Sequence, residues 1–441
     1  MAARRNKKRS IKRLLLTAVL VMAVFVLSAC STWDSFRETF ITKPQNESVP
    51  TITIGVIEPQ TGRYEGKGRD EIKGIELANS IYNNVDGYDV KLVKVDTQST
   101  VAGTETAIQA LIEMQPVAII GAAGEASSLT ISDYVDKPQI PTITPSASNP
   151  LITQRSRYYF RASLTESQMG EGLAEYAAEE LGSRNIAVIS IKNDTSASVL
   201  IDGFDERIKK IAGKRSNAIV MNEEILPNEE EMKRALMKLR YNAADVCFVS
   251  MGAEEMDTFF TLAEDMGLDG ITYLGTRSWG YEAFISMMDR HRNIKVVFPY
   301  ESVLTKNDDT SDTYTEEAQR FQIEYANRYG ADDVPSGNAA LGYDSYLILI
   351  NAFHNAKSTE GAAIRTALME LDELKCATGL FSFDDNGNVK RAVTLSTIKS
   401  GKPVTEYVTK IEAKAKVIED IETLKEEENN NNDYGAKNGL P

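Results

Sequence analysis

The sequence predicts an α/β protein made of two doubly wound parallel-sheet lobes with a ligand cleft between them. Short apolar runs alternate with amphipathic helical segments across short connections, which is typical of parallel sheets covered by helices on both faces. The alternation begins at Thr51 and starts again near residue 167. A chain of 441 residues is also long enough for two domains.

The first alternation extends from Thr51 to about residue 145. Its apolar runs predict strands over 51–57, 90–96, 117–121 and 141–145. Helices are predicted between them over 71–83, 105–114 and 128–137. In the first of these helices, Ile72, Ile75 and Ala78 recur at helical spacing and form one apolar face.

The second alternation begins with a helix over 167–182 that ends at Gly182, a residue typical of helix C-termini. Strands are predicted over 186–191, 218–225, 245–251, 271–275 and 295–300. Helices are predicted over 199–212, 229–240, 255–266 and 280–290. In open α/β sheets, ligands bind beyond the carboxyl ends of the strands, so the loops that follow each strand are the candidate ligand loops.

The C-terminal third is predicted to be mostly helical and then to form a hairpin. Helical patterns cover 316–330, 342–356 and 362–374. The segment 379–398 is predicted to be a hairpin that turns at Asp385–Gly387. Residues 412–441 are acidic, rich in asparagine and of low complexity, and we expect this tail to be disordered.

The N-terminal 29 residues have the pattern of a secretory signal peptide. Seven Lys or Arg lie within residues 4–13, and an apolar run of 14–27 follows. This run is short for a bilayer span, which needs roughly 20 residues. Leu27-Ser28-Ala29-Cys30 resembles the lipobox of bacterial lipoproteins, in which the cysteine receives a diacylglycerol and becomes the new N-terminus. The alternative is an uncleaved anchor helix with an incidental cysteine.

The charge of the chain argues against nucleic acid as a partner. Without the seven basic residues of the signal peptide, 42 of the 49 basic residues remain against 64 acidic ones, a net charge of −22. Nucleic-acid affinity depends largely on Lys and Arg at phosphates. The two histidines, His291 and His354, lack partners at metal-ligand spacing, and no metal or other cofactor is expected. Cys247 and Cys376 are expected to be buried free thiols, although a disulfide between them stays open.

A series of segments in order resembles the branched-chain amino-acid binding proteins, the type I solute-binding proteins of ABC importers. The similarity covers about residues 51–405. Its segments include TITIGVIEPQTGRYEGKGRDEIKGIELA, VAIIGAAGEASS, IPTITPSASNPLIT, YYFRASLTESQMGEGLAEY, IAVISIKND, ITYLGTRSWG and GYDSYLIL with FSFDDNGN. The resemblance implies two lobes that are joined by three crossing segments and close on a small polar ligand.

The resemblance also implies domain boundaries. Lobe 1 would comprise 51–162 and 302–378, and lobe 2 would comprise 163–300 and 380–410. The crossings would lie near Arg161–Ser163, Pro299–Glu301 and Phe381–Phe383. Residues 30–50 would be a lipidated cysteine followed by a flexible tether.

Two positions depart from the family's ligand-binding pattern. The family usually offers a serine to the ligand's carboxylate where this chain has Glu125, in the segment that also contains Ser127. It usually offers an acid to the ligand's ammonium where this chain has Arg277. The hydroxyl-bearing loop is kept as Ser146-Ala147-Ser148. Further candidates for ligand contact are Tyr64, Asp194, Ser196, Glu254 and Trp279, of which Trp279 is either a lid over the ligand or a packing residue.

Three hypotheses account for Glu125 and Arg277. The ligand binds with its charges reversed, its amine at Glu125 and its carboxylate at Arg277. Alternatively, the two side chains pair across the closed cleft and the ligand is less charged. In the third case, both side chains point away from the cleft. Like charges left together in a buried site cost several kcal/mol, so an amino acid in the family's usual orientation is not expected.

The expected function is capture of an amino acid or related polar metabolite by a lipid-anchored receptor on the extracytoplasmic face of the cell membrane. Its acyl chains would include palmitate, and its partners would be ABC permease subunits. We expect a monomer. The alternative is a sensor of the same fold that signals to a membrane partner. An enzyme is a distant third possibility, because the chain has no G-x-G-x-x-G after a strand, no G-x-S-x-G and no H-E-x-x-H.

Overall fold

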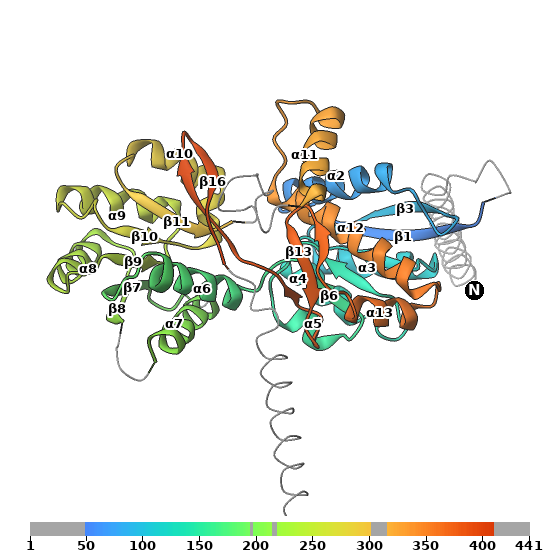
Figure 1. Ribbon diagram of the computed structural model, residues 1–441, viewed down its shortest axis with the longest axis horizontal. Helices are drawn as coiled ribbons and strands as arrows, with labels where there is room; N and C mark the ends of the chain where they lie inside the picture. The colour runs from blue at the N-terminus through green and yellow to red at the C-terminus, as the bar shows by residue number, and fades with distance from the viewer. Residues whose placement is uncertain (1–48, 195–196, 214–217, 301–314, 410–441) are drawn as a thin grey trace, which may run out of the picture.

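The computed structural model describes residues 49–194, 197–213, 218–300 and 315–409 (Figure 1). Its helices and strands gather around two separate large sheets, one on each side of the view in Figure 1. The mixed α/β class with two parallel-dominated sheets is therefore confirmed. The predicted signal peptide, Cys30, the tether up to residue 48 and the tail over 412–441 lie outside the described residues.

The first sheet has the strand order β2-β3-β1-β4-β5-β6. Its strands are β1 Thr51–Glu58, β2 Asn84–Val85, β3 Tyr88–Asp96, β4 Ala118–Ile120, β5 Thr142–Thr144 and β6 Tyr159–Arg161. All neighbouring pairs are parallel except the antiparallel edge pair of β2 and β3. Ile54, Val56 and Ile57 of β1 are buried, as expected for a central strand covered on both faces.

The helices of the first lobe come from both halves of the chain. They are α2 Glu65–Ile81, α3 Val101–Glu113, α4 Glu125–Ser132, α5 Leu151–Arg155, α11 Glu316–Tyr329, α12 Gly337–Ala356 and α13 Gly361–Met369. Helices α2 and α12 pack tightly against each other. A Cβ at Gly74 would lie 1.8 Å from the Ala339 carbonyl oxygen, so the close approach of these helices depends on glycine.

The second sheet has the strand order β16-β15-β11-β10-β9-β7-β8. Its strands are β7 Ile186–Ile191, β8 Ile219–Ile225, β9 Val246–Val249, β10 Thr272–Leu274, β11 Lys295–Pro299, β15 Thr394–Lys399 and β16 Lys402–Val408. Strands β7 to β11 are parallel, whereas β15 and β16 add an antiparallel edge. Its helices are α6 Glu166–Glu175, α7 Ser198–Ala212, α8 Glu229–Tyr241, α9 Ala253–Asp265 and α10 Glu282–Met287.

The predicted helix over 167–182 changes its type before it ends. Helix α6 is α-helical to Glu175, and a π-helical turn over Tyr176–Glu180 follows. Gly182 then takes a φ of 62°, which agrees with its predicted role as a terminator. Thr165 and Gln168 form a capping box at the helix start, which fixes where the chain enters the second lobe.

A small three-stranded sheet is formed by the part of the chain between β11 and β15, two strands of the second large sheet. It contains β12 Leu374–Cys376, β13 Gly379–Phe383 and β14 Val389–Lys390. The predicted hairpin turn is confirmed, because Ser382 and Phe383 pair with Lys390 and Val389 across it. The hairpin lies against the end of β6, where the Arg161 N–H donates to the Gly387 carbonyl at 3.0 Å.

The two cysteines of the described residues are free and fully buried. Cys247 lies in β9 of the second sheet and Cys376 in β12, so the expectation of two buried thiols is confirmed. Burial raises the pKa of the Cys247 thiol well above its ordinary value. No helix within the described ranges combines the length and hydropathy that a membrane span requires.

Candidate ligand-binding site at the sheet edges

Three loops of the first lobe meet at the carboxyl edge of its sheet. They follow β1, β4 and β5, which are neighbours in the sheet and parallel. This edge is where ligands bind in open α/β folds. The loop after β4 leads into α4 at Glu125, and the loop after β5 contains Ser146, Ala147 and Ser148. The fold therefore brings these candidate residues together.

The Glu125 carboxylate holds the loop after β5. Its oxygens accept the backbone N–H groups of Ser148 at 2.9 Å and of Asn149 at 2.8 Å. On the other side of the loop, the buried Arg161 guanidinium donates to the carbonyls of Ser148 and Asn149. Burial lowers the pKa of Arg161 to about 10, and the charge of Glu125 opposes this shift. The loop is thus fixed between an anion and a cation.

The Ser148 hydroxyl joins this loop to the second lobe. Its oxygen lies 3.3 Å from Glu125 Oε1, 3.4 Å from Glu166 Oε1 and 3.4 Å from a terminal nitrogen of Arg277. Glu166 begins α6, and Arg277 begins the short 3-10 helix Arg277–Gly280 after β10. Arg277 also forms an ion pair with Glu166, with Nε and Oε1 3.5 Å apart. The two carboxylates and the guanidinium are each partly exposed, so a solute could reach them.

A second pair of carboxyl groups lies beneath the same edge. Glu58 ends β1 and Glu71 lies on α2, and both are fully buried. Glu58 Oε2 accepts the Ala123 N–H at 2.6 Å, and Glu71 Oε1 accepts the Ser146 hydroxyl. Burial raises the pKa of both groups, and the charge of Glu71 raises the pKa of Glu58 further. The charge of Lys67 opposes both shifts. Burial and mutual repulsion of the two carboxyl groups favour one proton shared between them.

The hydrogen bonding of the other two carboxyl oxygens of this pair supports a shared proton. Glu58 Oε1 and Glu71 Oε2 are buried and have no donor among the side chains and backbone of the described residues. A buried acceptor without a donor is costly, whereas a proton held between the two carboxyl groups satisfies both oxygens.

Two other candidates lie near the first-lobe edge. Ser127 is buried on α4 and accepts a hydrogen bond from the Thr104 hydroxyl at 2.9 Å. Tyr64 lies just before α2, is 37% exposed and has its ring close to Gly124. Its exposure leaves the ring able to cover a solute at this edge.

The second-lobe candidates are more dispersed. Asp194 follows β7 and is partly exposed, and Glu254 is exposed in the first turn of α9. Ser196 lies outside the described residues. Trp279 is fully buried, stacks on Phe284 with ring centroids 4.6 Å apart and donates its indole N–H to the Met251 carbonyl at 2.8 Å. Of the two roles considered for Trp279, these contacts describe packing.

Sequence reasoning did not select four residues of this arrangement: Glu58, Glu71, Arg161 and Glu166. Glu58 ends an otherwise apolar strand, and Glu71 lies next to the apolar face of α2. A charged residue at an inward-facing position is the sequence feature that could have identified both. Arg161 likewise ends the apolar run YYF. Glu166 carried no local signal, because its role depends on where the second lobe places Arg277.

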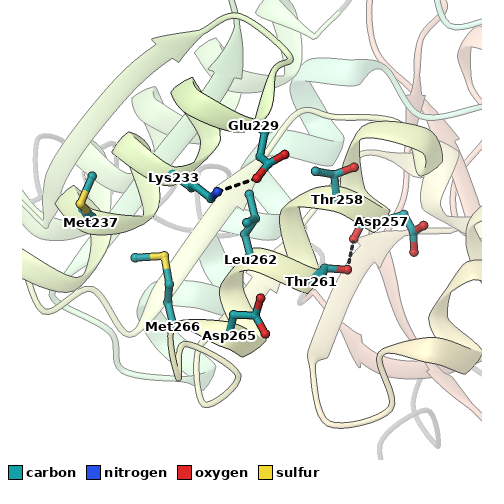
Figure 2. Close-up of a pocket in the computed structure, with 9 residues that line it drawn as sticks. All are labelled: Glu229, Lys233, Met237, Asp257, Thr258, Thr261, Leu262, Asp265 and Met266. Carbon is teal, nitrogen blue, oxygen red and sulfur yellow. Dashed lines mark hydrogen bonds and ion pairs between the residues drawn. The ribbon is translucent and has the colours of Figure 1, made fainter.

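A separate groove of about 560 Å³ lies between α8 and α9 on the second lobe (Figure 2). Met237, Leu262 and Met266 line it together with Glu229, Asp257 and Asp265. Figure 2 shows Lys233 paired with Glu229 at one side of this groove. None of the candidate residues lines it. Within the described residues, no three His, Cys, Asp or Glu side chains form a cluster that could hold a metal.

The sequence of this chain matches a known protein family. Residues 51–403 match the family model described as periplasmic binding protein. An amino acid binding protein of Pseudomonas aeruginosa is 26% identical over 202 residues, 45% of this chain and 53% of that protein. This chain therefore spans about half the length of that relative.

Two further relatives are matched over most of their length. Leu/Ile/Val-binding protein homolog 3 of Brucella melitensis is 22% identical over 353 residues, 76% of this chain and 92% of that protein. A branched-chain amino acid transporter substrate binding protein of Streptococcus pneumoniae, solved with isoleucine, superposes with a TM-score of 0.61 at 23% identity. That superposition covers 81% of this chain and 99% of the other. The two-lobed fold and the extent of the family match together show that this chain belongs to the periplasmic binding protein family.

Proposed function

We propose that this chain is the solute-binding component of an ABC importer and that it captures an amino acid or a related small polar metabolite between its lobes. The observation that supports this most directly is the contact of Ser148 with both Glu166 and Arg277. A solute at this place touches charged groups of both lobes. The Brucella and Streptococcus relatives, named for branched-chain amino acids, support the same class of solute.

The proposed mechanism is capture by lobe closure. A solute that binds groups of both lobes stabilises the closed arrangement more than the open one and shifts the equilibrium between them. The chain passes from β6 of the first sheet into α6 of the second lobe through only four residues, 162–165. This short connection lets the lobes rotate about a defined hinge. The closed form would then dock on permease subunits as a monomer.

We further propose that the protein acts at the outer face of the cell membrane and is held there by lipid on Cys30. The support is the lipobox-like Leu27-Ser28-Ala29-Cys30 after a basic and apolar leader. A diacylglycerol provides two acyl chains, which retain a protein at a membrane far better than one. A tethered receptor stays close to the permease that it supplies.

A thermal-shift screen of the full chain in detergent tests the proposed function. The panel contains amino acids, short amides, polyamines, dicarboxylates, sugars and nucleosides. A solute that binds only the folded protein raises the melting temperature through mass action. A concentration-dependent shift with an amino acid, an amide or an amine is expected. Shifts confined to sugars or nucleosides would contradict the proposed solute class.

A further inference from the structure

Carboxylates of the protein itself occupy the hydrogen-bond donors at the first-lobe edge. The loop after β5 places the N–H groups of Ser148 and Asn149 together, as a site for an anion would. Glu125 already accepts both of them, and it contacts the Ser148 hydroxyl as well. An anion from solution would therefore have to displace Glu125 to use these donors.

The neighbouring donors are occupied in the same way. The Ala123 N–H, in the loop after β4, donates to Glu58. The Ser146 hydroxyl has one proton, and it donates this proton to Glu71. The Ala147 N–H donates to the Thr144 hydroxyl oxygen at 3.3 Å. Three glutamates and one threonine of the first lobe thus accept the hydrogen bonds of these donors.

The partly exposed side chains at this site differ in whether they accept or donate hydrogen bonds. Glu125 and Glu166 offer carboxylate oxygens, which accept hydrogen bonds only. The donor that faces them at Ser148 is Arg277, which comes from the second lobe. On the first-lobe side of the cleft, Glu125 therefore presents acceptor oxygens. Glu166 and Arg277, which form an ion pair, both lie on the second-lobe side, so the facing donor comes from that lobe.

We propose that the solute turns a hydrogen-bond donor, an ammonium or an amide N–H, toward Glu125 and seats no carboxylate on the loop over 145–149. This inference rests on the proposed function and specifies its ligand class. It assigns Glu125 as the residue that determines specificity, because this side chain already accepts the two N–H groups that a solute carboxylate would need on this loop. An acidic group on the solute, where there is one, lies toward Arg277.

The variant Glu125→Ser tests this inference by removing the carboxylate that binds the loop after β5. Serine is too short to reach the Ser148 and Asn149 N–H groups as Glu125 does, so these donors become available to a carboxylate from solution. We expect L-leucine and its deaminated analogue 4-methylpentanoate to bind Glu125→Ser at least tenfold more tightly than they bind the wild type. L-leucinamide, which has the amine and no carboxylate, should bind no more tightly to the variant.

Titration calorimetry of the full chain in detergent measures these affinities. The isosteric variant Glu125→Gln keeps the side-chain size, and we expect it to weaken L-leucinamide relative to 4-methylpentanoate. Glu229→Ser is the control for charge loss, because Glu229 is also the first residue of a helix but lies exposed on the second lobe. Its affinities should equal those of the wild type.

The outcomes separate this inference from the proposed function. The inference is overturned if Glu125→Ser, folded as judged by its circular dichroism, binds L-leucine and 4-methylpentanoate no more tightly than the wild type does. It is also overturned if the wild type prefers 4-methylpentanoate to L-leucinamide. In either case, a wild-type shift with another amino acid in the thermal screen would leave the proposed function standing.

Discussion

The Ser148 hydroxyl oxygen lies 3.4 Å from the guanidinium of Arg277, although 129 positions separate the two residues in the chain. Ser148 belongs to a loop of the first sheet, and Arg277 follows a strand of the second. The two lobes therefore meet through polar groups at the edge where solutes bind in this type of fold. Solute affinity should depend on the side chains at this contact.

Replacing Ser148 with Ala removes the hydroxyl that contacts Glu125, Glu166 and Arg277 together. The backbone N–H that binds Glu125 is kept, so the loop should hold its shape. We expect solute affinity to fall about tenfold, since one hydrogen bond to a charged group contributes about 1.5–3 kcal/mol. Calorimetry with the solute that gives the largest thermal shift measures this change. Ser132→Ala is the control, because the Ser132 hydroxyl donates only to Leu129 within α4.

Replacing Gly74 with Ala should destabilise the first lobe. The added Cβ would lie 1.8 Å from the Ala339 carbonyl oxygen, so α2 and α12 would have to separate. Overpacking of this kind costs about 1–3 kcal/mol, and contact with rigid backbone places the cost at the upper end. Chemical denaturation measures the change in the free energy of unfolding.

Gly66→Ala is the matched control for this change. Gly66 lies on the same helix, and a Cβ added there would have no neighbouring atom within 4 Å. Alanine there should stabilise α2 by about 0.5–1 kcal/mol. If Gly74→Ala and Gly66→Ala changed the free energy of unfolding equally, close packing of α2 on α12 would not be the reason for glycine at position 74.

Glu58→Gln should flatten the dependence of stability on pH. The pKa values of Glu58 and Glu71 are raised above the ordinary value of 4.5, so the native state binds protons more tightly than the unfolded chain. The stability that this pair contributes is therefore fully present below pH 4.5 and declines as pH rises toward the raised values. Glutamine resembles the protonated acid and does not titrate.

Melting temperatures across this pH range test the shared proton. The melting temperature of Glu58→Gln minus that of the wild type should become more positive as pH rises from about 4.5 to 8. Glu113→Gln, at an exposed position at the end of α3, is the control and should follow the wild type. A constant difference between Glu58→Gln and the wild type would argue against a titrating buried pair.

Replacing Cys30 with Ser should release the protein from the membrane. Serine has no thiol to receive the diacylglycerol, so the proposed anchor cannot form. Fractionation of cells with a radioactive palmitate label measures both retention and lipidation. We expect the label and most of the membrane-bound protein to be lost in the variant. Unlabelled wild-type protein would contradict the proposed lipid anchor.

The sheets could be predicted from the sequence because their strands are buried on both faces and appear as continuous apolar runs, as in β1 and β9. The two-residue strand β2 and the π-helical turn after Glu175 could not be predicted, because neither produces a periodic pattern. The helix end at Gly182 and the turn at Asp385–Gly387 could be predicted, because both depend on glycines with positive φ, a local property of the chain.

The candidate site was predictable only in part, for a physical reason. Spacing within one segment placed Glu125 and Ser148 beside the same sheet edge. It did not indicate that Glu125 would bind the Ser148 and Asn149 backbone, or that Arg277 would pair with Glu166. These contacts depend on how two lobes are positioned relative to each other, which is set by tertiary packing rather than by local pattern.

The central claim is that the solute binds between the lobes at Arg277, and titration calorimetry of Arg277→Ala tests it most directly. The titrant is the compound with the largest thermal shift, and Arg292→Ala, an exposed arginine of the same lobe, is the control. We predict that Arg277→Ala weakens binding at least tenfold while Arg292→Ala leaves it unchanged. Equal affinity in Arg277→Ala and the wild type would contradict the account and place the solute elsewhere.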